Sequence, residues 1–381
     1  MLLVALLHWA QSCAHPVAPC CGDPPPSQEA PAGAAVTQEQ RAKLKWFEGT
    51  FEELLAEASR SQRLVFLEFW SQWIPLSKKI DKLTLSDPKV VAELEGVLCY
   101  SVDADCKQGK ALRKKFQVQT PPVLVFLDPE GSLREQLSGF FAPESLLVEL
   151  ARIKRNEGTF SDLRARIQAD PADLDARWVL ACKHRYIGDL PGFEEQVSQI
   201  RERDPEGKMV ASRRLRLYEL HSAAAAQLDL EPLYAFVRDE KDRKLLFEGW
   251  LDIWNLEGQA ARSTRDVEKS RAHELRYFAA ARALWPLVPK EEHGRLGNNI
   301  AWNFYLSRAN ATRSDLEFAL AVAEKAVAAA PDHPAVVDTY ACCLFAVGRR
   351  DESLLHVKRC IDLDPQNPQW RERLAEFQKS R

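Results

Sequence analysis

The sequence of 381 residues lacks a strong charge of either sign and lacks several familiar enzyme motifs. Its 52 Lys and Arg residues nearly balance 55 Asp and Glu residues, so the formal net charge is −3. This balance offers no broad basic field for nucleic acid. The chain also contains no P-loop, no G-x-G-x-x-G fingerprint and no H-E-x-x-H zinc motif. We therefore expect no nucleic-acid partner, no cofactor and no metal site.

Nine cysteines are present, but no two of them form a Cys-X-X-Cys pair. Cys182, Cys342, Cys343 and Cys360 fall in helical patterns, where cysteine commonly packs as a small apolar residue. Cys99 lies inside a predicted strand, where we expect a buried and unreactive thiol. The spacing of the cysteines is not that of a small disulfide-bonded domain.

The apolar run at residues 1–10 is too short to span a bilayer. It lacks the basic region of a secretory signal, although Ser12-Cys13-Ala14 fits a small-residue cleavage site. The same stretch weakly resembles a lipoprotein box, in which Cys13 is acylated and anchors the protein to a membrane. A mis-assigned start codon is the third explanation. Residues 15–36, rich in Pro, Ala and Gly, predict a disordered linker, so residues 1–36 stand apart as a signal or lipoprotein segment with a linker.

Residues 37–155 carry the pattern of an α/β domain. A capping box at Thr37 and Gln40 predicts a helix that continues through Ser59. Short apolar runs predict strands, and the stretches between them predict helices. The expected strands are Leu64–Trp70, Val97–Asp105, Val123–Asp128 and Ser132–Gly139, and the later helices are Ser77–Leu83, one opening at Asp87-Pro88, Gly109–Phe116 and Pro143–Arg155. This order predicts a sheet that is covered on both faces.

Two stretches of this domain carry a specific resemblance. Residues 66–78, FLEFWSQWIPLSK, and residues 118–131, VQTPPVLVFLDPEG, resemble the active-site turn and the cis-proline segment of the thioredoxin superfamily. The branch that they most resemble is that of the extracytoplasmic thiol–disulfide interchange proteins. The resemblance implies a thioredoxin-like α/β fold in which Pro122 matches the cis-proline.

The chain departs from that family at the residues that carry its chemistry. The two thiol positions, which follow Trp73, fall on Ile74 and Ser77. The family needs a thiolate at the tip of a helix and a second thiol that resolves the mixed disulfide, so we expect no catalytic residue here. Glu68 matches the buried acid of the family. Because it has no thiol to serve, we expect a partly solvated carboxylate beside a basic side chain such as that of Lys78.

Two further features bear on substrates and thiols. Pro121 precedes the matched cis-proline and has no N–H, so one donor for strand-like pairing with a peptide is missing. Cys106 follows the second strand at its carboxyl end, the edge of an α/β sheet where sites lie. A lone loop cysteine is more often incidental than catalytic, so a redox role for Cys106 is only our alternative.

Residues 156–381 show a repeat of 34 residues, which is the tetratricopeptide (TPR) period. Pro171 and Pro205 lie 34 positions apart, and so do Pro331 and Pro365. Small residues fall where the two helices of a repeat would cross, and glycine or proline where they would end. The signature positions are Ala181, Gly188, Pro205, Ala326, Pro331, Ala341, Gly348, Cys360 and Pro365. We predict an all-α helical solenoid of TPR type.

Other parts of this region follow the repeat less closely. Residues 207–290 have helical patterns but match the repeat poorly, so we interpret them as degenerate helical pairs. Residues 298–334 resemble a repeat with a lengthened turn near 308–313. The final stretch, which opens at Pro368, predicts a helix that caps the stack.

Three functions remain open at this point. The first is a non-catalytic scaffold of the bacterial envelope that binds a protein or peptide in a groove of the repeats and carries a redox-inactive thioredoxin-like domain. The second is a thiol–disulfide enzyme that uses Cys106, and the third is a chaperone-like holder of unfolded chains. We favour the first, because without the two thiols the domain has no pair of groups that can carry out disulfide exchange. We expect it in the periplasm or, through Cys13, as an envelope lipoprotein.

Overall fold

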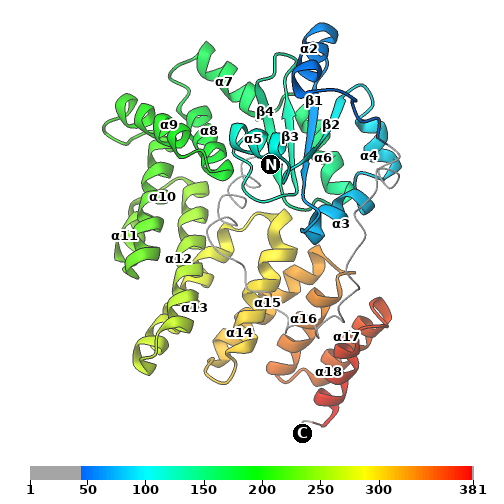
Figure 1. The fold of residues 1–381 in the computed structure, drawn as a ribbon. Helices are drawn as coiled ribbons and strands as arrows, with labels where there is room; N and C mark the ends of the chain where they lie inside the picture. Colours follow the sequence, from blue (N-terminus) through cyan, green and yellow to red (C-terminus); the bar gives the residue numbers. More distant parts are fainter. Residues whose placement is uncertain (1–43, 380–381) are drawn as a thin grey trace. The chain divides into compact units, whose positions relative to one another are not determined.

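The computed structural model describes residues 44–379, which divide between Leu215 and Arg216 into two compact units (Figure 1). The capping box predicted at Thr37 and the segment around Cys13 lie outside the described residues. Between residues 44 and 379, no helix combines the length and the apolar character that crossing a bilayer requires.

The first unit contains a four-stranded mixed sheet with the strand order β2-β1-β3-β4. The strands are β1 (Val65–Trp70), β2 (Leu98–Asp103), β3 (Val123–Leu127) and β4 (Leu133–Ser138). Strand β1 pairs in parallel with β2, whereas β3 pairs antiparallel with both β1 and β4. Each predicted strand is therefore present, and the mixed sheet is the one expected of a thioredoxin-like domain.

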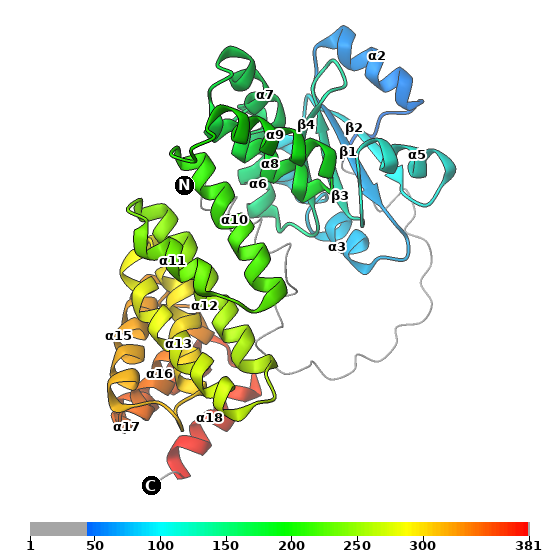
Figure 2. The same ribbon diagram turned by 90° about the vertical axis from the view of Figure 1, so that its left-hand side faces the viewer.

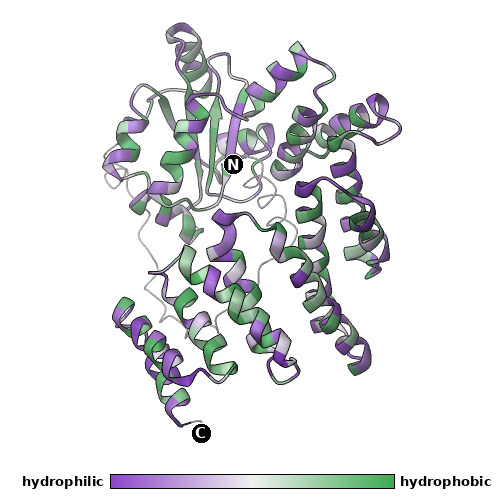
Figure 3. Cartoon of the chain, turned by 180° about the vertical axis from the view of Figure 1, so that it is seen from behind, coloured by the Kyte–Doolittle hydropathy of each residue, from purple (hydrophilic) through white to green (hydrophobic). Residues whose placement is uncertain are grey.

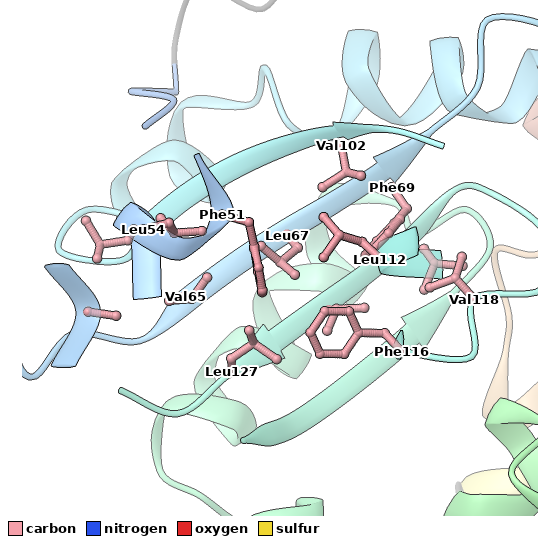
Figure 4. Packing of buried hydrophobic residues seen from close by; sticks show 14 residues of the cluster. Phe51, Leu54, Val65, Leu67, Phe69, Val102, Leu112, Phe116, Val118 and Leu127 are labelled. Carbon is pink, nitrogen blue, oxygen red and sulfur yellow. The ribbon is translucent and has the colours of Figure 1, made fainter. Parts of the chain in front are cut away.

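Helices cover both faces of this sheet. They are α2 (Phe51–Ser61), α3 (Pro75–Leu83), α4 (Pro88–Glu93), α5 (Lys107–Lys115) and α6 (Pro143–Lys154). Alternate residues of β1 point to opposite faces, so Leu67 packs with α2 and α5 while Phe66 packs with α3, α4 and α6. Figure 4 shows the first of these clusters, in which Phe51 and Phe116 meet over the sheet with ring centroids 6.0 Å apart.

The first helix begins later than the sequence predicted. Residues 44–50 are not helical, and Trp46 instead forms a parallel bridge to Cys99, beside which the N–H of Phe47 donates to the Cys99 carbonyl at 2.7 Å. Helix α2 starts after Thr50, whose hydroxyl accepts the Glu53 N–H at 3.2 Å. The prediction of a helix over residues 44–50 was wrong because pairing with β2 satisfies that backbone, and no local pattern reveals this pairing.

Helix α5 packs very closely on the end of β2, and Gly109 is the residue that permits it. A Cβ placed on Gly109 would lie 1.8 Å from the carbonyl oxygen of Asp103. No side chain fits in that space. Glycine is needed here because the backbones of α5 and β2 lie in close contact, and not because of an unusual φ angle.

Three helices of the predicted repeat region belong to the same compact unit as the sheet. They are α7 (Phe160–Ala169), α8 (Leu174–Ile187) and α9 (Leu190–Arg203). Helices α7 and α8 contact the edge strand β4, whose unpaired backbone groups would otherwise be open to pairing with another strand. Arg164 donates to the Leu133 carbonyl at 3.1 Å, and the Ser138 N–H donates to the Tyr186 hydroxyl at 3.1 Å. The compact unit thus extends beyond residue 155, where we placed the change of fold type.

A buried ion network fixes this attachment. The Glu135 carboxylate on β4 accepts from Lys183 of α8 at 2.6 Å and from Arg152 of α6 at 2.7 Å. The side chains of Glu135 and Lys183 are only 2% and 3% exposed. Burial lowers the pKa of Lys183, and the charge of Glu135 offsets part of that effect. The network therefore joins the sheet, α6 and the first repeat through one carboxylate.

The second unit is entirely helical. After α10 (Val210–Gln227), which crosses the division, it contains α11 (Glu231–Asp239), α12 (Arg243–Ser263), α13 (Val267–Leu284), α14 (Asn298–Leu306), α15 (Arg313–Ala329), α16 (Pro334–Ala346), α17 (Arg350–Leu363) and α18 (Pro368–Lys379), with short turns of other helix types at 285–297. Figure 2 shows α12 and α13 running side by side. Apolar and polar stretches alternate along these helices in Figure 3, as expected of helices that bury one face each.

Two helix pairs repeat the same spacing. Helices α8 and α9 start at Leu174 and Leu190, and α16 and α17 start at Pro334 and Arg350, so the second helix begins 16 residues after the first in both pairs. Helices α14 and α15 form another pair, with a turn at 307–312. The described chain thus has the predicted fold class, a thioredoxin-like α/β domain followed by a long all-α region of paired, TPR-like helices.

Residues 207–290 form longer helices than a TPR pair would contain. Helix α12 has 21 residues and α13 has 18. The buried Glu257 carboxylate of α12 accepts from Tyr234 of α11 at 2.9 Å and from Arg276 of α13 at 2.9 Å. Trp254 stacks on Tyr277 at 5.4 Å between ring centroids, so polar and aromatic contacts together join the three helices.

We predict that Glu135→Gln lowers the free energy of unfolding by about 3–5 kcal/mol, because it leaves the buried Lys183 ammonium beside a neutral amide. Urea unfolding followed by circular dichroism measures the change. Lys154→Ala is the control, since its pair with Glu93 is 36% and 46% exposed and should contribute less than about 1 kcal/mol. Equal losses in the two variants would contradict a structural role for the buried network.

We also predict that Gly109→Ala destabilises the protein, although alanine has the higher helix propensity by about 1 kcal/mol. The new Cβ would collide with the Asp103 carbonyl, so α5 must move away from β2. The measurement is the thermal unfolding of Gly109→Ala. The control is Ala111→Gly at an exposed position of the same helix, which changes the helix propensity without a packing contact. A rise in melting temperature for Gly109→Ala would show that the close approach is unimportant.

Candidate functional site

The candidate site is the turn that joins β1 to α3 at the carboxyl end of the central strand. Strand β1 ends at Trp70, and α3 starts at Pro75 with Ile74 in the N-cap position. The side chain of Ile74 makes no capping hydrogen bond, because it has no acceptor atom. The helix tip that would stabilise a thiolate therefore carries a half-buried aliphatic group.

Ser77, the second position of the missing pair, is a buried packing residue. It is 1% exposed, and its hydroxyl accepts the backbone N–H of Ser71 at 3.3 Å. The Ser71 hydroxyl in turn donates to the Asp105 carboxylate at 2.7 Å and accepts the Trp73 N–H at 3.3 Å. Neither serine bonds to a histidine within residues 44–379, so neither hydroxyl has an imidazole base to activate it.

Trp73 and Leu76 lie on the surface of this turn. The Trp73 side chain is 77% exposed and that of Leu76 is 44% exposed. Side chains with this exposure do not pack in the hydrophobic core. The turn therefore presents an apolar surface where a redox relative would present sulfur.

The segment that precedes β3 contains a cis peptide bond between Pro121 and Pro122. Both prolines are buried, and the Pro122 carbonyl accepts the Gly139 N–H at 2.9 Å. Gln119, two residues before Pro121, lies against the first repeat, because a Cβ placed on Gly188 would be 2.9 Å from its side-chain nitrogen. The first helical pair therefore approaches the loop that leads to the cis bond.

Glu68 is completely buried. Our prediction of a partly solvated carboxylate was wrong, because β1 lies between β2 and β3 and is covered on both faces by helices. Its register partner on β2 is Ser101 and its partner on β3 is Leu124. The acid thus lies buried on the central part of the sheet, between β2 and β3.

The cysteines of the described chain are all free thiols. Cys99 is buried, and desolvation raises its pKa to about 12, which suits an unreactive thiol. Cys106 is exposed and forms the N-cap of α5, where its sulfur accepts the Gly109 N–H at 3.2 Å. Cys342, Cys343 and Cys360 are buried among helices, and no group of three or more His, Cys, Asp or Glu side chains in residues 44–379 has the geometry to hold a metal ion.

The repeat signature residues lie at helix ends and crossings. Gly188 and Gly348 follow α8 and α16 with positive φ angles of 83° and 89°, which favour glycine. Pro205, Pro331 and Pro365 each stand two residues after a helix ends. The small residues at crossings are buried: Ala181, Ala326, Ala341 and Cys360.

Sequence reasoning did not find the contacts that organise the site. Ser71 and Asp105 are 34 residues apart, and their hydrogen bond joins the turn to the loop that opens α5. The position of Asp105 at the end of a predicted strand was the one available signal. Glu135 and Lys183 are 48 residues apart and gave no local signal, since buried pairs of this kind depend on tertiary packing.

Sequence comparison relates part of this chain to known proteins. Residues 51–154 match the family model of a thioredoxin-like domain. The thiol:disulfide interchange protein DsbD of Ralstonia nicotianae is 32% identical over 104 residues, covering 26% of this chain and 17% of that protein. DsbD of Campylobacter jejuni is 28% identical over 102 residues, covering 26% and 18%. The chain thus spans less than a fifth of the length of these two relatives.

Similar solved structures include a thioredoxin from Thermus thermophilus, which is 30% identical and covers 29% of this chain and 87% of its own, with a TM-score of 0.27. The oxidised C-terminal domain of Neisseria meningitidis DsbD is 22% identical, with coverage of 30% and 100% and a TM-score of 0.25. A thermophilic TPR protein, also of Thermus thermophilus, is 15% identical, with coverage of 61% and 94% and a TM-score of 0.25. The chain carries an N-terminal thioredoxin-like domain, similar in sequence to one region of DsbD, ahead of its TPR-like helices.

Proposed function

We propose that this protein is a non-catalytic interaction or scaffold protein. The observation that carries the proposal is the pair of residues at the thiol positions: an aliphatic Ile74 at the tip of α3 and a buried Ser77 one turn later. Disulfide exchange requires a thiolate that attacks and a second thiol that resolves the intermediate. Neither group is available at this turn, so a thioredoxin-like domain of this kind serves recognition.

The helical region supports the same function. Stacked helical pairs complete one another's cores and expose an extended surface, which suits the binding of a peptide or a helix. Buried polar contacts hold neighbouring helices of the stack in defined positions. For example, Arg373 of the last helix donates to both oxygens of Asp338 on α16 at 3.2 Å. A protein or peptide partner in the groove of these helices is our proposal, and a chaperone-like holder would use the same surfaces without a fixed partner.

We further propose that the protein acts outside the cytoplasm of a bacterium, in the periplasm or as an envelope lipoprotein. The support is the sequence around Cys13, which fits a signal cleavage or lipoprotein site, and the similarity of residues 51–154 to DsbD. Membrane anchoring through acylated Cys13 would bring the interaction surfaces to the envelope.

A second candidate function is supported by one observation. Cys106 is exposed, and its sulfur already accepts a backbone N–H at the start of α5. Such a position offers hydrogen-bond support to a thiolate. A thiol enzyme that uses Cys106 would need a resolving cysteine from its partner, because Cys99, on the preceding strand β2, is buried.

We predict that the purified full-length protein does not accelerate insulin reduction by dithiothreitol above the uncatalysed rate. The reason is the missing thiolate at the α3 tip. Turnover that disappears in the Cys106→Ser variant would refute the non-catalytic function and support a thiol enzyme that uses Cys106. As a positive control, Ile74→Cys with Ser77→Cys restores the pair at the helix tip and should give measurable turnover.

We predict that mass spectrometry of the protein from its native host finds a mature chain that begins at Cys13 with added acyl mass, or just after Ala14. An unprocessed chain that begins at Met1 would contradict export.

We predict that affinity capture with the protein from its native host yields one stoichiometric partner. Many substoichiometric clients would favour the chaperone-like alternative.

A further inference from the structure

We propose that Trp73 and the basic face of α5 together form a docking surface for an acidic protein segment that carries apolar side chains. This proposal rests on the proposed interaction function and names the class of partner. It assigns the degenerate active-site turn as a binding surface in its own right, separate from the groove of the helical repeats.

The apolar half of the surface is Trp73 with Leu76. An aromatic ring that is 77% exposed gains nothing from the fold, because its apolar area remains in contact with water. Exposed tryptophan next to other apolar residues is typical of the anchors that dominate protein interfaces. The backbone of the turn is fixed at this residue, since the backbone N–H of Trp73 donates to the Ser71 hydroxyl at 3.3 Å.

The basic half of the surface is α5. Its sequence, KQGKALRKK, has five basic residues and no acidic one. Arg113 is occupied, because it donates to the carbonyls of Val118 and Gln119, and Lys115 lies 5.0 Å from the ring centroid of Phe51. The remaining three lysines are exposed and form no ion pair within residues 44–379: Lys107, Lys110 and Lys114.

These three lysines are spaced by three and four residues, so they share one face of the helix. Like charges at this spacing repel one another and weaken a helix. None of the three forms an ion pair within residues 44–379, so an acidic segment would convert the repulsion into attraction. We refer to Lys107, Lys110 and Lys114 as the lysine stripe.

Two hydrogen bonds join the apolar half to the basic half. The Ser71 hydroxyl donates to Asp105 at 2.7 Å, and the Ala104 N–H donates to the Trp70 carbonyl at 2.9 Å. The turn that carries Trp73 is thereby fixed to the loop that opens α5. Both carboxylates of this loop accept hydrogen bonds from within the protein: Asp105 accepts from Ser71, and Asp103 accepts the Asp105 N–H at 2.9 Å.

The chemistry of the surface selects the partner. An aromatic anchor beside a stripe of lysines matches a segment in which Glu or Asp alternates with Leu or Phe, because each half then finds its complement. Nucleic acid or an anionic membrane would need a broader basic field than a protein of net charge −3 offers.

The test uses the full chain and a fluorescein-labelled glutamate-rich peptide that carries leucine and phenylalanine, with binding followed by fluorescence anisotropy. We expect saturable binding that weakens as salt rises. Replacing the lysine stripe by glutamate should weaken binding about tenfold or more. Trp73→Ala should weaken it to a similar extent while leaving the salt dependence unchanged.

Matched controls are available on the second unit. Reversing Lys241, Lys325 and Lys358, which are exposed, changes the net charge equally and should leave binding intact. Leu355→Ala, at a side chain that is 64% exposed, is the control for Trp73→Ala. Circular dichroism of every variant checks that the fold is retained.

The proposal is overturned if the peptide does not bind, if a lysine-rich peptide of the same apolar content binds equally well, or if only one half of the surface matters. Stripe-dependent binding to vesicles of anionic phospholipid, without peptide binding, would assign the surface to a membrane instead. These outcomes are independent of the insulin assay, whose turnover would refute the non-catalytic function whatever the peptide does.

Discussion

A single buried carboxylate joins three parts of the first compact unit: strand β4, helix α6 and helix α8. Glu135 stands on the edge strand of the sheet and is shielded from water, so its charge is tolerable only while Arg152 and Lys183 contact it. Those two cations come from the last helix of the α/β domain and from the first helical pair. Removing Glu135 would leave the Lys183 ammonium, which is 3% exposed, without its carboxylate, whereas Arg152 would still pair with Glu149.

This attachment gives the thioredoxin-like domain a surface that differs from that of a free-standing domain. The edge strand β4 is closed by Arg164 and Tyr186, and the loop before the cis bond lies against Gly188. In the turn between β1 and α3, Trp73 is exposed, and hydrogen bonds at Ser71 and Trp70 join this turn to the loop that opens α5. The absence of thiols at Ile74 and Ser77, together with this exposed apolar turn, is the basis of the binding function that we propose.

Most of the local structure was predictable because it depends on local rules. The apolar runs of β1 and β3, Asp87 as the cap before Pro88, and the glycine and proline that end paired helices each follow from a few neighbouring residues. The prediction failed over residues 44–50, where pairing with a distant strand replaces the helix. It failed also at Glu68, because its solvation depends on two neighbouring strands and two layers of helices.

The amino-acid order alone was enough to establish that the chain has no Cys-X-X-Cys pair, that an α/β domain precedes a helical repeat, and that α5 carries only basic charge. These are properties of composition, order and spacing. The folded chain was needed to learn that Ser71 meets Asp105, that Glu135 meets Lys183, and that Trp73 is exposed beside the start of α5. Each of these depends on bringing together residues many positions apart, and the side-chain periodicity of a single strand or helix contains no information on such contacts.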